Sequence, residues 1–115
     1  MKTVKMLREG LIESLWVVMM VLISIFTWTQ PLIMFTLVLI ISAFKLWVDR
    51  DAAVYYFVAA VSGPLVEIVC VYFGIWSYTL PQFLGIPIWL PLVWGMFGLF
   101  LKKFQDIYVE FRRGK

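Results

Sequence analysis

The sequence predicts an all-α membrane protein with four transmembrane helices and both termini in the cytoplasm. One observation is composition: 63% of the 115 residues are hydrophobic, against roughly 45–50% in soluble domains. A soluble fold of this size would lack polar side chains to cover its surface, whereas lipid removes that need. The other observation is charge placement, because the ten basic residues flank long uncharged segments.

The first uncharged segment runs from Ser14 to Phe44. It is too long for one span, since about 20 residues cross the hydrocarbon core. Pro31 suits the first turn of a second helix, where its missing N–H costs little. We therefore predict helices over about 10–28 and 31–47. A single kinked helix is the alternative.

The second apolar segment, 52–101, carries one charged residue, Glu67. Its turn-forming residues mark a loop in the middle. They are Gly74, Ser77, Pro81, Gly85 and Pro87. We predict helices over about 52–76 and 87–104, with the charged tail 105–115 extending the last helix along the membrane surface. Residues 1–115 then form a single transmembrane domain.

Four spans place the N-terminus, the turn at 48–51 and the C-terminus on one side. These segments hold every basic residue: Lys2, Lys5, Arg8, Lys45, Arg50, Lys102, Lys103, Arg112, Arg113 and Lys115. Positive charge stays on the cytoplasmic side, so the pattern indicates a multi-pass protein of the cell membrane. Three spans would leave the positive charge of one terminus outside. This distribution also argues against nucleic acid as a partner.

Histidine is absent, and Cys70 is the single cysteine. This composition excludes His-based metal sites, Ser-His-Asp triads, intrachain disulfides and multi-cysteine metal sites. We therefore expect no metal and no cofactor, and we interpret Cys70 as an inert small residue.

Glu67 is the main candidate for chemistry. It lies 16 residues beyond Asp51, which is about 24 Å along a helix and therefore in the outer half of the bilayer. A carboxyl group at such depth is costly and usually faces a partner or a cavity. Glu67 is thus a candidate catalytic acid, proton carrier or polar anchor for an apolar ligand.

The helix face around Glu67 is built mostly from small residues. Spacings of three and four put these residues on one face: Tyr56, Ala60, Gly63, Glu67, Cys70 and Gly74. Two interpretations remain open. The face allows close helix packing, with Glu67 bonded to a Ser, Tyr or Trp, or it forms a slot for a ligand beside the acid. It also predicts a homo-oligomer or a partner membrane subunit, with this face at the interface or beside the pocket.

Aromatic residues gather in the predicted outer loop. They are Trp76, Tyr78, Phe83 and Trp89, with Trp94 deeper. They form either an aromatic belt at the headgroup level or the wall of a pocket for a hydrophobic small molecule or lipid. The candidate ligand-binding residues are Tyr56, Gly63, Trp76, Tyr78, Trp89 and Trp94.

Glu13 is the other acid inside an apolar segment, about one turn into the first helix. Its carboxylate either reaches the cytoplasmic headgroup zone or serves as a proton-coupling site for export.

Residues 63–94 resemble the signature region of membrane carotenoid-biosynthesis proteins of the carotenoid hydratase type and, more distantly, the small-subunit lycopene cyclases. The matching positions are Gly63, Glu67, Gly74, Trp76, Tyr78, Gly85, Pro87 and Trp94. The resemblance implies a carotenoid cyclase or hydratase-like subunit acting on an isoprenoid. The hydratases are longer, and Ile88 and Trp89 replace the paired acidic motif of the cyclases. A chain of this size is therefore expected to need a partner or a second copy.

Two other functions stay open. Size, four spans and the glutamate of the first helix are similar to the small multidrug-resistance transporters, which implies a proton-coupled transporter that uses Glu67 or Glu13. The surrounding sequence of that family's first helix is not found here. A non-catalytic subunit of a larger membrane complex is the third interpretation.

Overall fold

The computed structural model describes residues 2–113, and in this range it contains helices and no strands. The elements are α1 (Lys2–Thr27), α2 (Pro31–Val48), the 3-10 turn η1 (Arg50–Ala52), α3 (Ala53–Tyr72) and α4 (Leu90–Arg113). The prediction of an all-α fold with four long helices is confirmed. Lys115, which was predicted to be cytoplasmic, lies outside the described residues.

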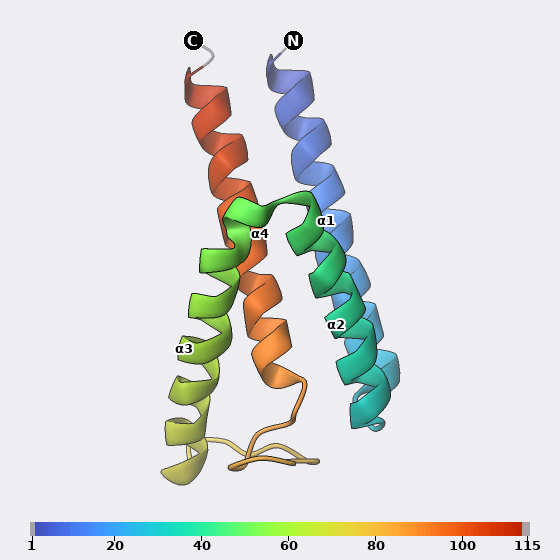
Figure 1. Cartoon of the computed structure of the whole chain (residues 1–115), viewed down its shortest axis with the longest axis vertical. Coiled ribbons are helices and arrows are strands. Elements are labelled where there is room, and N and C mark those ends of the chain that lie inside the picture. The colour runs from blue at the N-terminus through green and yellow to red at the C-terminus, as the bar shows by residue number, and fades with distance from the viewer. Residues whose placement is uncertain (1, 114–115) are drawn as a thin grey trace.

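Three of the helices, α1, α2 and α3, are long and apolar enough to cross a membrane. The fourth, α4, is apolar at its start and charged over its second half. The start of α1, the end of α4 and the turn between α2 and α3 lie towards the same end of the bundle, and α1 and α4 project beyond the turn (Figure 1). This is the end that carries the basic residues.

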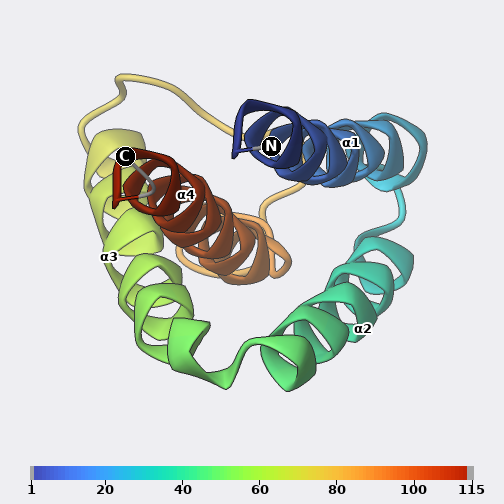
Figure 2. The ribbon, with the colours of Figure 1, turned by 90° about the horizontal axis from the view of Figure 1, so that it is seen from above.

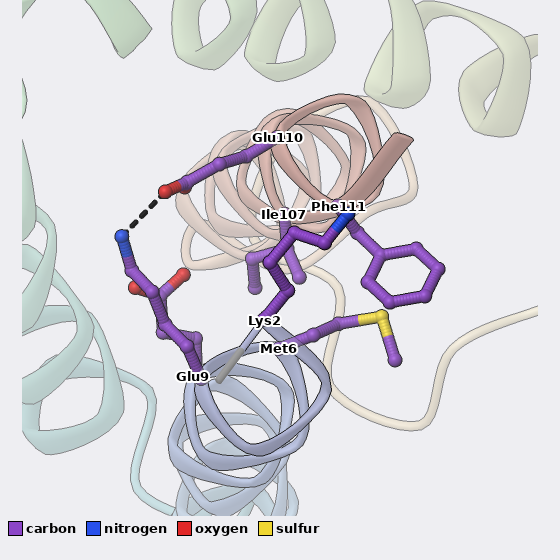
Figure 3. Close-up of a pocket in the computed structure, with 7 residues that line it drawn as sticks. Lys2, Met6, Glu9, Ile107, Glu110 and Phe111 are labelled. Atoms are coloured by element: carbon purple, nitrogen blue, oxygen red, sulfur yellow. Dashed lines mark hydrogen bonds and ion pairs between the residues drawn. The ribbon is translucent and has the colours of Figure 1, made fainter. Parts of the chain in front are cut away.

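The helix α1 begins at Lys2 rather than near residue 10, because its first turns pack against the end of α4 (Figure 3). Lys5 forms an ion pair with Glu110. Lys2 places its ammonium 6.0 Å from the centre of the Phe111 ring. The predicted tail is therefore helical as far as Arg113, and it continues α4 beside α1.

The helix α3 ends at Tyr72 rather than at residue 76, because Gly74 adopts a left-handed conformation with φ of 76°. The amide of Ile75 donates to the Cys70 carbonyl at 2.9 Å, and the amide of Gly74 donates to the Val71 carbonyl at 3.0 Å. This is the Schellman arrangement, which satisfies the last carbonyl groups and stops the helix.

The start of α4 is at Leu90 rather than at Pro87, because the residues before it form two turns. A tight turn joins Phe83 to Ile86, with φ of 49° at Leu84 and 85° at Gly85. In a further turn the Leu90 amide donates to the Pro87 carbonyl at 3.2 Å. The loop therefore folds back beneath the start of α4 (Figure 1).

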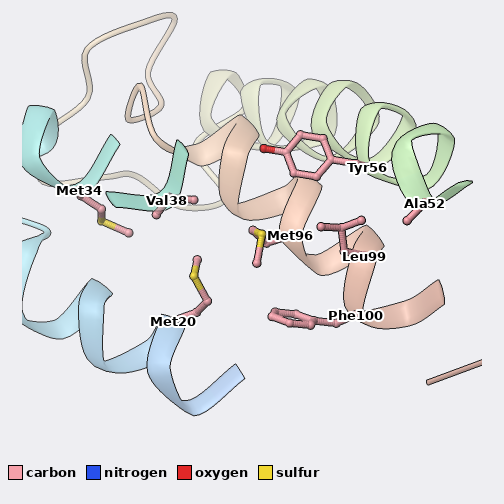
Figure 4. Close-up of a cluster of buried hydrophobic side chains, with 8 residues drawn as sticks. All are labelled: Met20, Met34, Val38, Ala52, Tyr56, Met96, Leu99 and Phe100. Atoms are coloured by element: carbon pink, nitrogen blue, oxygen red, sulfur yellow. The ribbon is translucent and has the colours of Figure 1, made fainter. Parts of the chain in front are cut away.

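Seen from above, α1, α2 and α3 surround α4 on three sides (Figure 2). All four helices and η1 contribute to one hydrophobic core (Figure 4). Its buried members are Met20, Met34, Val38, Ala52, Tyr56, Met96, Leu99 and Phe100. Because α4 occupies the centre of the bundle, its packing against the other helices sets the positions of the residues around Glu67 and Glu13.

Two glycines of α4 allow it to approach α3 closely. A Cβ atom at Gly95 would lie 2.5 Å from the Tyr56 ring, and one at Gly98 would lie 2.4 Å from the Tyr55 carbonyl oxygen. Neither position has room for a side chain. Close approach of this kind is how helices associate in lipid, where dispersion contacts replace the hydrophobic effect as the driving force.

We predict that Gly98→Ala lowers the stability of the bundle by about 1–3 kcal/mol, the usual cost of overpacking. Gly10→Ala is the matched control, because nothing lies within 4 Å of a Cβ at that position. Thermal unfolding in mild detergent, followed by circular dichroism, measures both. An equal effect of the two substitutions would contradict the close α3–α4 contact.

Candidate functional site

Glu67 lies near the end of α3, at the junction of α3, α4 and the loop between them. The phenol of Tyr78 donates a hydrogen bond of 2.7 Å to Glu67 Oε2. The indole N–H of Trp94 donates to the same oxygen at 3.3 Å. We name these three residues the Glu67 cluster. One carboxyl oxygen thus links the loop and α4 to α3.

Gly63 makes room for the Trp94 ring one turn away from Glu67. A Cβ atom at residue 63 would lie 2.0 Å from Trp94 Cδ2. The indole therefore fills the space that any side chain at this position would need. The next residue, Pro64, is also buried within α3. Gly63 is thus the residue that lets the Trp94 N–H reach Glu67.

The second carboxyl oxygen of Glu67, Oε1, receives no hydrogen bond from any group within residues 2–113; both bonds end on Oε2. The Glu67 side chain is half-buried. Chemically, the cluster can hold a hydrogen-bond donor on Oε1 or exchange a proton there, while two aromatic donors fix Oε2.

Tyr78 is held as a neutral phenol. Burial of its side chain raises its pKa above the ordinary value of 10.0, and the hydrogen bond to Glu67 raises this pKa further. A phenol that resists ionisation remains a donor to the carboxyl group over the whole physiological pH range.

The structure thus brings Gly63, Tyr78 and Trp94 to Glu67. Another candidate, Tyr56, is on the same face of α3 but eleven residues away, which is about 16 Å along the axis. It donates a hydrogen bond of 2.8 Å to Ser42 Oγ in the core. The sequence analysis grouped Tyr56 with Glu67 because they share a helix face, although the number of residues between them already separates them along the axis.

The remaining aromatic candidates have other surroundings. Trp89 is half-buried and packs against the hydrophobic core. Trp76 is 43% exposed and makes no hydrogen bond within the described part of the chain. The small-residue face of α3, proposed from the sequence for a subunit interface or a pocket, packs at Tyr56 and Gly63 against α4 of the same chain.

No family model, no characterised protein and no solved structure matches this chain. Within residues 2–113, no group of three or more His, Cys, Asp or Glu side chains is placed to hold a metal ion.

Glu13 lies inside the bundle, with 4% of its surface exposed. Its Oε1 accepts a hydrogen bond of 2.9 Å from the Lys45 ammonium. That ammonium also lies 4.8 Å from the centre of the Trp16 ring. Glu13 is therefore one partner of a buried ion pair.

Sequence reasoning missed this pair, although a signal was present. Glu13 lies fourteen residues before the end of α1 at Thr27, and Lys45 lies fourteen residues after the start of α2 at Pro31. In two antiparallel helices joined by a short turn, residues equally far from the turn lie at the same height. The count predicts their proximity once the turn is placed correctly.

We predict that the hydrogen bond from Tyr78 protects the loop from alkaline protease up to about pH 10 and loses its effect above that. The pKa of Tyr78 is raised in the folded state. The stabilisation is therefore complete below the unfolded value and disappears as the pH rises through the folded value. As the pH rises above this range, the rate of cleavage near residues 75–82 should increase about fivefold, which corresponds to the free energy of one net hydrogen bond.

Tyr78→Phe should show the faster cleavage already at pH 8, with little further rise. Tyr72→Phe is the matched control, because Tyr72 is 82% exposed, and it should behave like the wild type. Identical pH profiles for the wild type and Tyr78→Phe would show that the bond does not hold the loop.

Proposed function

We propose that this is a multi-pass protein of the cell membrane that holds an elongated hydrophobic molecule, of isoprenoid or carotenoid type, beside Glu67 in the outer leaflet. The observation that carries the proposal is the Glu67 cluster: a half-buried carboxyl group with Oε2 fixed by Tyr78 and Trp94 and Oε1 unbonded. An acid among aromatic rings suits an apolar ligand with one polar or unsaturated group.

As a subunit of the carotenoid cyclase or hydratase kind, the protein would use Glu67 as an acid. Its carboxyl group would give a proton to a C=C bond, the π electrons would form the new C–H bond, and the neighbouring carbon would become cationic. The face of an aromatic ring stabilises such a cation. Tyr78 and Trp94 bond to the acid through the O–H and N–H groups at their ring edges, and the cationic carbon would lie against a face of one of these rings.

The four-span topology with cytoplasmic termini is part of this proposal. The apolar part of α4, 90–101, covers about 18 Å, less than the roughly 30 Å of the hydrocarbon core. Residues 86–89 would cover more of that thickness. Irregular backbone in a membrane needs partners within the protein. Ile86 and Pro87 are buried, and the Ile88 amide donates to the Gln82 side chain at 3.1 Å, which supports this placement.

We also propose that a second copy or a partner membrane subunit completes the ligand site. The outward face of α3 next to Glu67 is open, since Val66 is 61% and Val69 is 54% exposed. A ligand beside Glu67 would be covered by this chain on one side.

The alternative functions are a small proton-coupled transporter, which the burial of Glu13 favours, and a non-catalytic subunit of a larger complex.

The topology is tested with single cysteines in a Cys70→Ser background. An impermeant thiol reagent added to intact cells should label Gln82→Cys and leave Arg50→Cys unlabelled until the cells are opened. The reason is that the basic residues share one end of the bundle and orient it towards the cytoplasm. Labelling of position 50 from outside would overturn the four-span arrangement.

Glu67 is tested by comparing a polar and an apolar replacement. Glu67→Gln keeps hydrogen bonding and removes the acid, so the bound molecule should remain while turnover falls by at least about a hundredfold, the usual contribution of general acid catalysis. Glu67→Leu removes both, and the bound molecule should be lost. Mass spectrometry of the protein from mild detergent identifies the coextracted molecule and the copy number.

Glu110→Gln is the matched control, because Glu110 is an exposed acid at the opposite end. If all three variants keep the same bound molecule and the same activity, Glu67 is not the site.

A further inference from the structure

A cavity lies between α1, α2 and α4, at the opposite end of the bundle from Glu67. Its volume is about 290 Å³, close to the lower limit of roughly 300 Å³ for pockets that take small ligands. Its walls combine the apolar side chains of Ile12, Phe44 and Leu99 with charged groups. A pocket of this composition accepts a small amphipathic molecule.

The Lys45 ammonium shows what this cavity recognises. It lies 2.9 Å from Glu13 Oε1, 4.8 Å from the centre of the Trp16 ring and 5.9 Å from the centre of the Phe100 ring. A carboxylate combined with aromatic faces is the arrangement by which proteins bind organic ammonium ions. Lys45 occupies this position as a ligand supplied by the chain itself.

The carboxylate is only half satisfied. Glu13 Oε2 is buried and has no hydrogen-bond partner within the described residues, and 5% of the side chain is exposed. A buried acceptor without a donor is destabilising, and more so when it is charged. The site therefore has an acceptor for one more N–H group.

Charged groups of both signs surround the cavity. Three carboxylates line it, those of Glu9, Glu13 and Asp49, and two ammonium groups do, those of Lys45 and Lys103. Asp49 is also paired with Lys102 at 3.3 Å, so these charges balance, and the feature that selects a cation is the unbonded Oε2 of Glu13. Glu9 offers Lys45 another partner when it leaves Glu13, and the flexible four-carbon stem of Lys45 allows the move.

We propose that this cavity binds a primary ammonium ion carried on a short apolar chain or ring, and that Lys45 is a tethered competitor for the same place. The ligand ammonium bonds to Glu13, and its apolar part lies against Trp16 and Phe44. This site is separate from the Glu67 cluster, and it does not depend on the function proposed for that cluster.

The test uses radiolabelled 4-phenylbutylamine and the full chain in nanodiscs of zwitterionic lipid, with empty nanodiscs as the background. Equilibrium dialysis should show saturable binding of one amine per chain. The alcohol 4-phenylbutan-1-ol, which has the same shape and no charge, should bind at least about tenfold more weakly. Equal binding of the amine and the alcohol would overturn the proposal.

Variants locate the site. Glu13→Gln should weaken amine binding at least about tenfold, while Lys45→Met should strengthen it about tenfold by removing the competitor. Glu110→Gln and Glu67→Gln should bind as the wild type does. Unchanged binding in Glu13→Gln, or weaker binding in folded Lys45→Met, would overturn the proposal.

A measurement on the wild-type chain decides the matter if these variants do not fold. An alkyl amine that carries a diazirine is bound and then crosslinked by light. Mass spectrometry should find the label in peptides that contain residues 9–16 or 44–49. Labelling confined to other segments would overturn the proposal.

Discussion

The close contact of α3 with α4 is the constraint on which the rest of the structure depends. It is made where a glycine of one helix receives a large group of the other: Gly63 receives the Trp94 ring, and Gly95 receives the Tyr56 ring. In lipid, such contacts and interhelical hydrogen bonds hold helices together. The same contact therefore sets the α3–α4 packing and orients the indole N–H of Trp94 and the hydroxyl of Tyr56. The tip of Trp94 reaches Glu67, and the tip of Tyr56 reaches Ser42 on α2.

The two buried or half-buried acids are held in opposite ways. Two neutral donors bond to Oε2 of Glu67, and its Oε1 has no hydrogen-bond partner within residues 2–113. Glu13 is paired with a full positive charge, and 5% of its side chain is exposed. Burying an ion pair brings little net stability, because desolvation cancels most of the attraction. The Glu13–Lys45 pair therefore contributes little to holding the helices together.

Much of the fold follows from local chemistry in the sequence. Pro31 marks the start of α2 as predicted, because its missing N–H suits a first helical turn. The ends around the α3–α4 loop were less predictable. Several turn residues, among them Gly74 and Pro87, lie within a few residues of the observed helix ends. Tertiary contacts decide at which of them α3 ends and α4 begins. One such contact is that of Gly85 with Val71, which holds the turn against α3.

The candidate site was predictable in its acid and in part of its surroundings. Glu67 stands out by charge alone, and Gly63, Tyr78 and Trp94 follow from helical spacing and loop position. Helical periodicity gives the face of a residue and not its partner across the bundle. This is why Tyr56 was assigned to the acid although it bonds to Ser42. It is also why Lys45 was not assigned to Glu13.

Glu13 and Glu67 each find their partners within their own helical hairpin, and this bears on how the chain is made. Lys45 follows Glu13 by 32 residues, within α1 and α2. Tyr78 and Trp94 follow Glu67 by 11 and 27 residues, within α3, the loop and α4. In the proposed topology, a hairpin leaving the ribosome carries its acid and the matching donors together. The second hairpin can then enter the bilayer without a partner for Glu67 from the first. The nascent chain exposes either of these two carboxyl groups unpaired only while its own hairpin is unfinished.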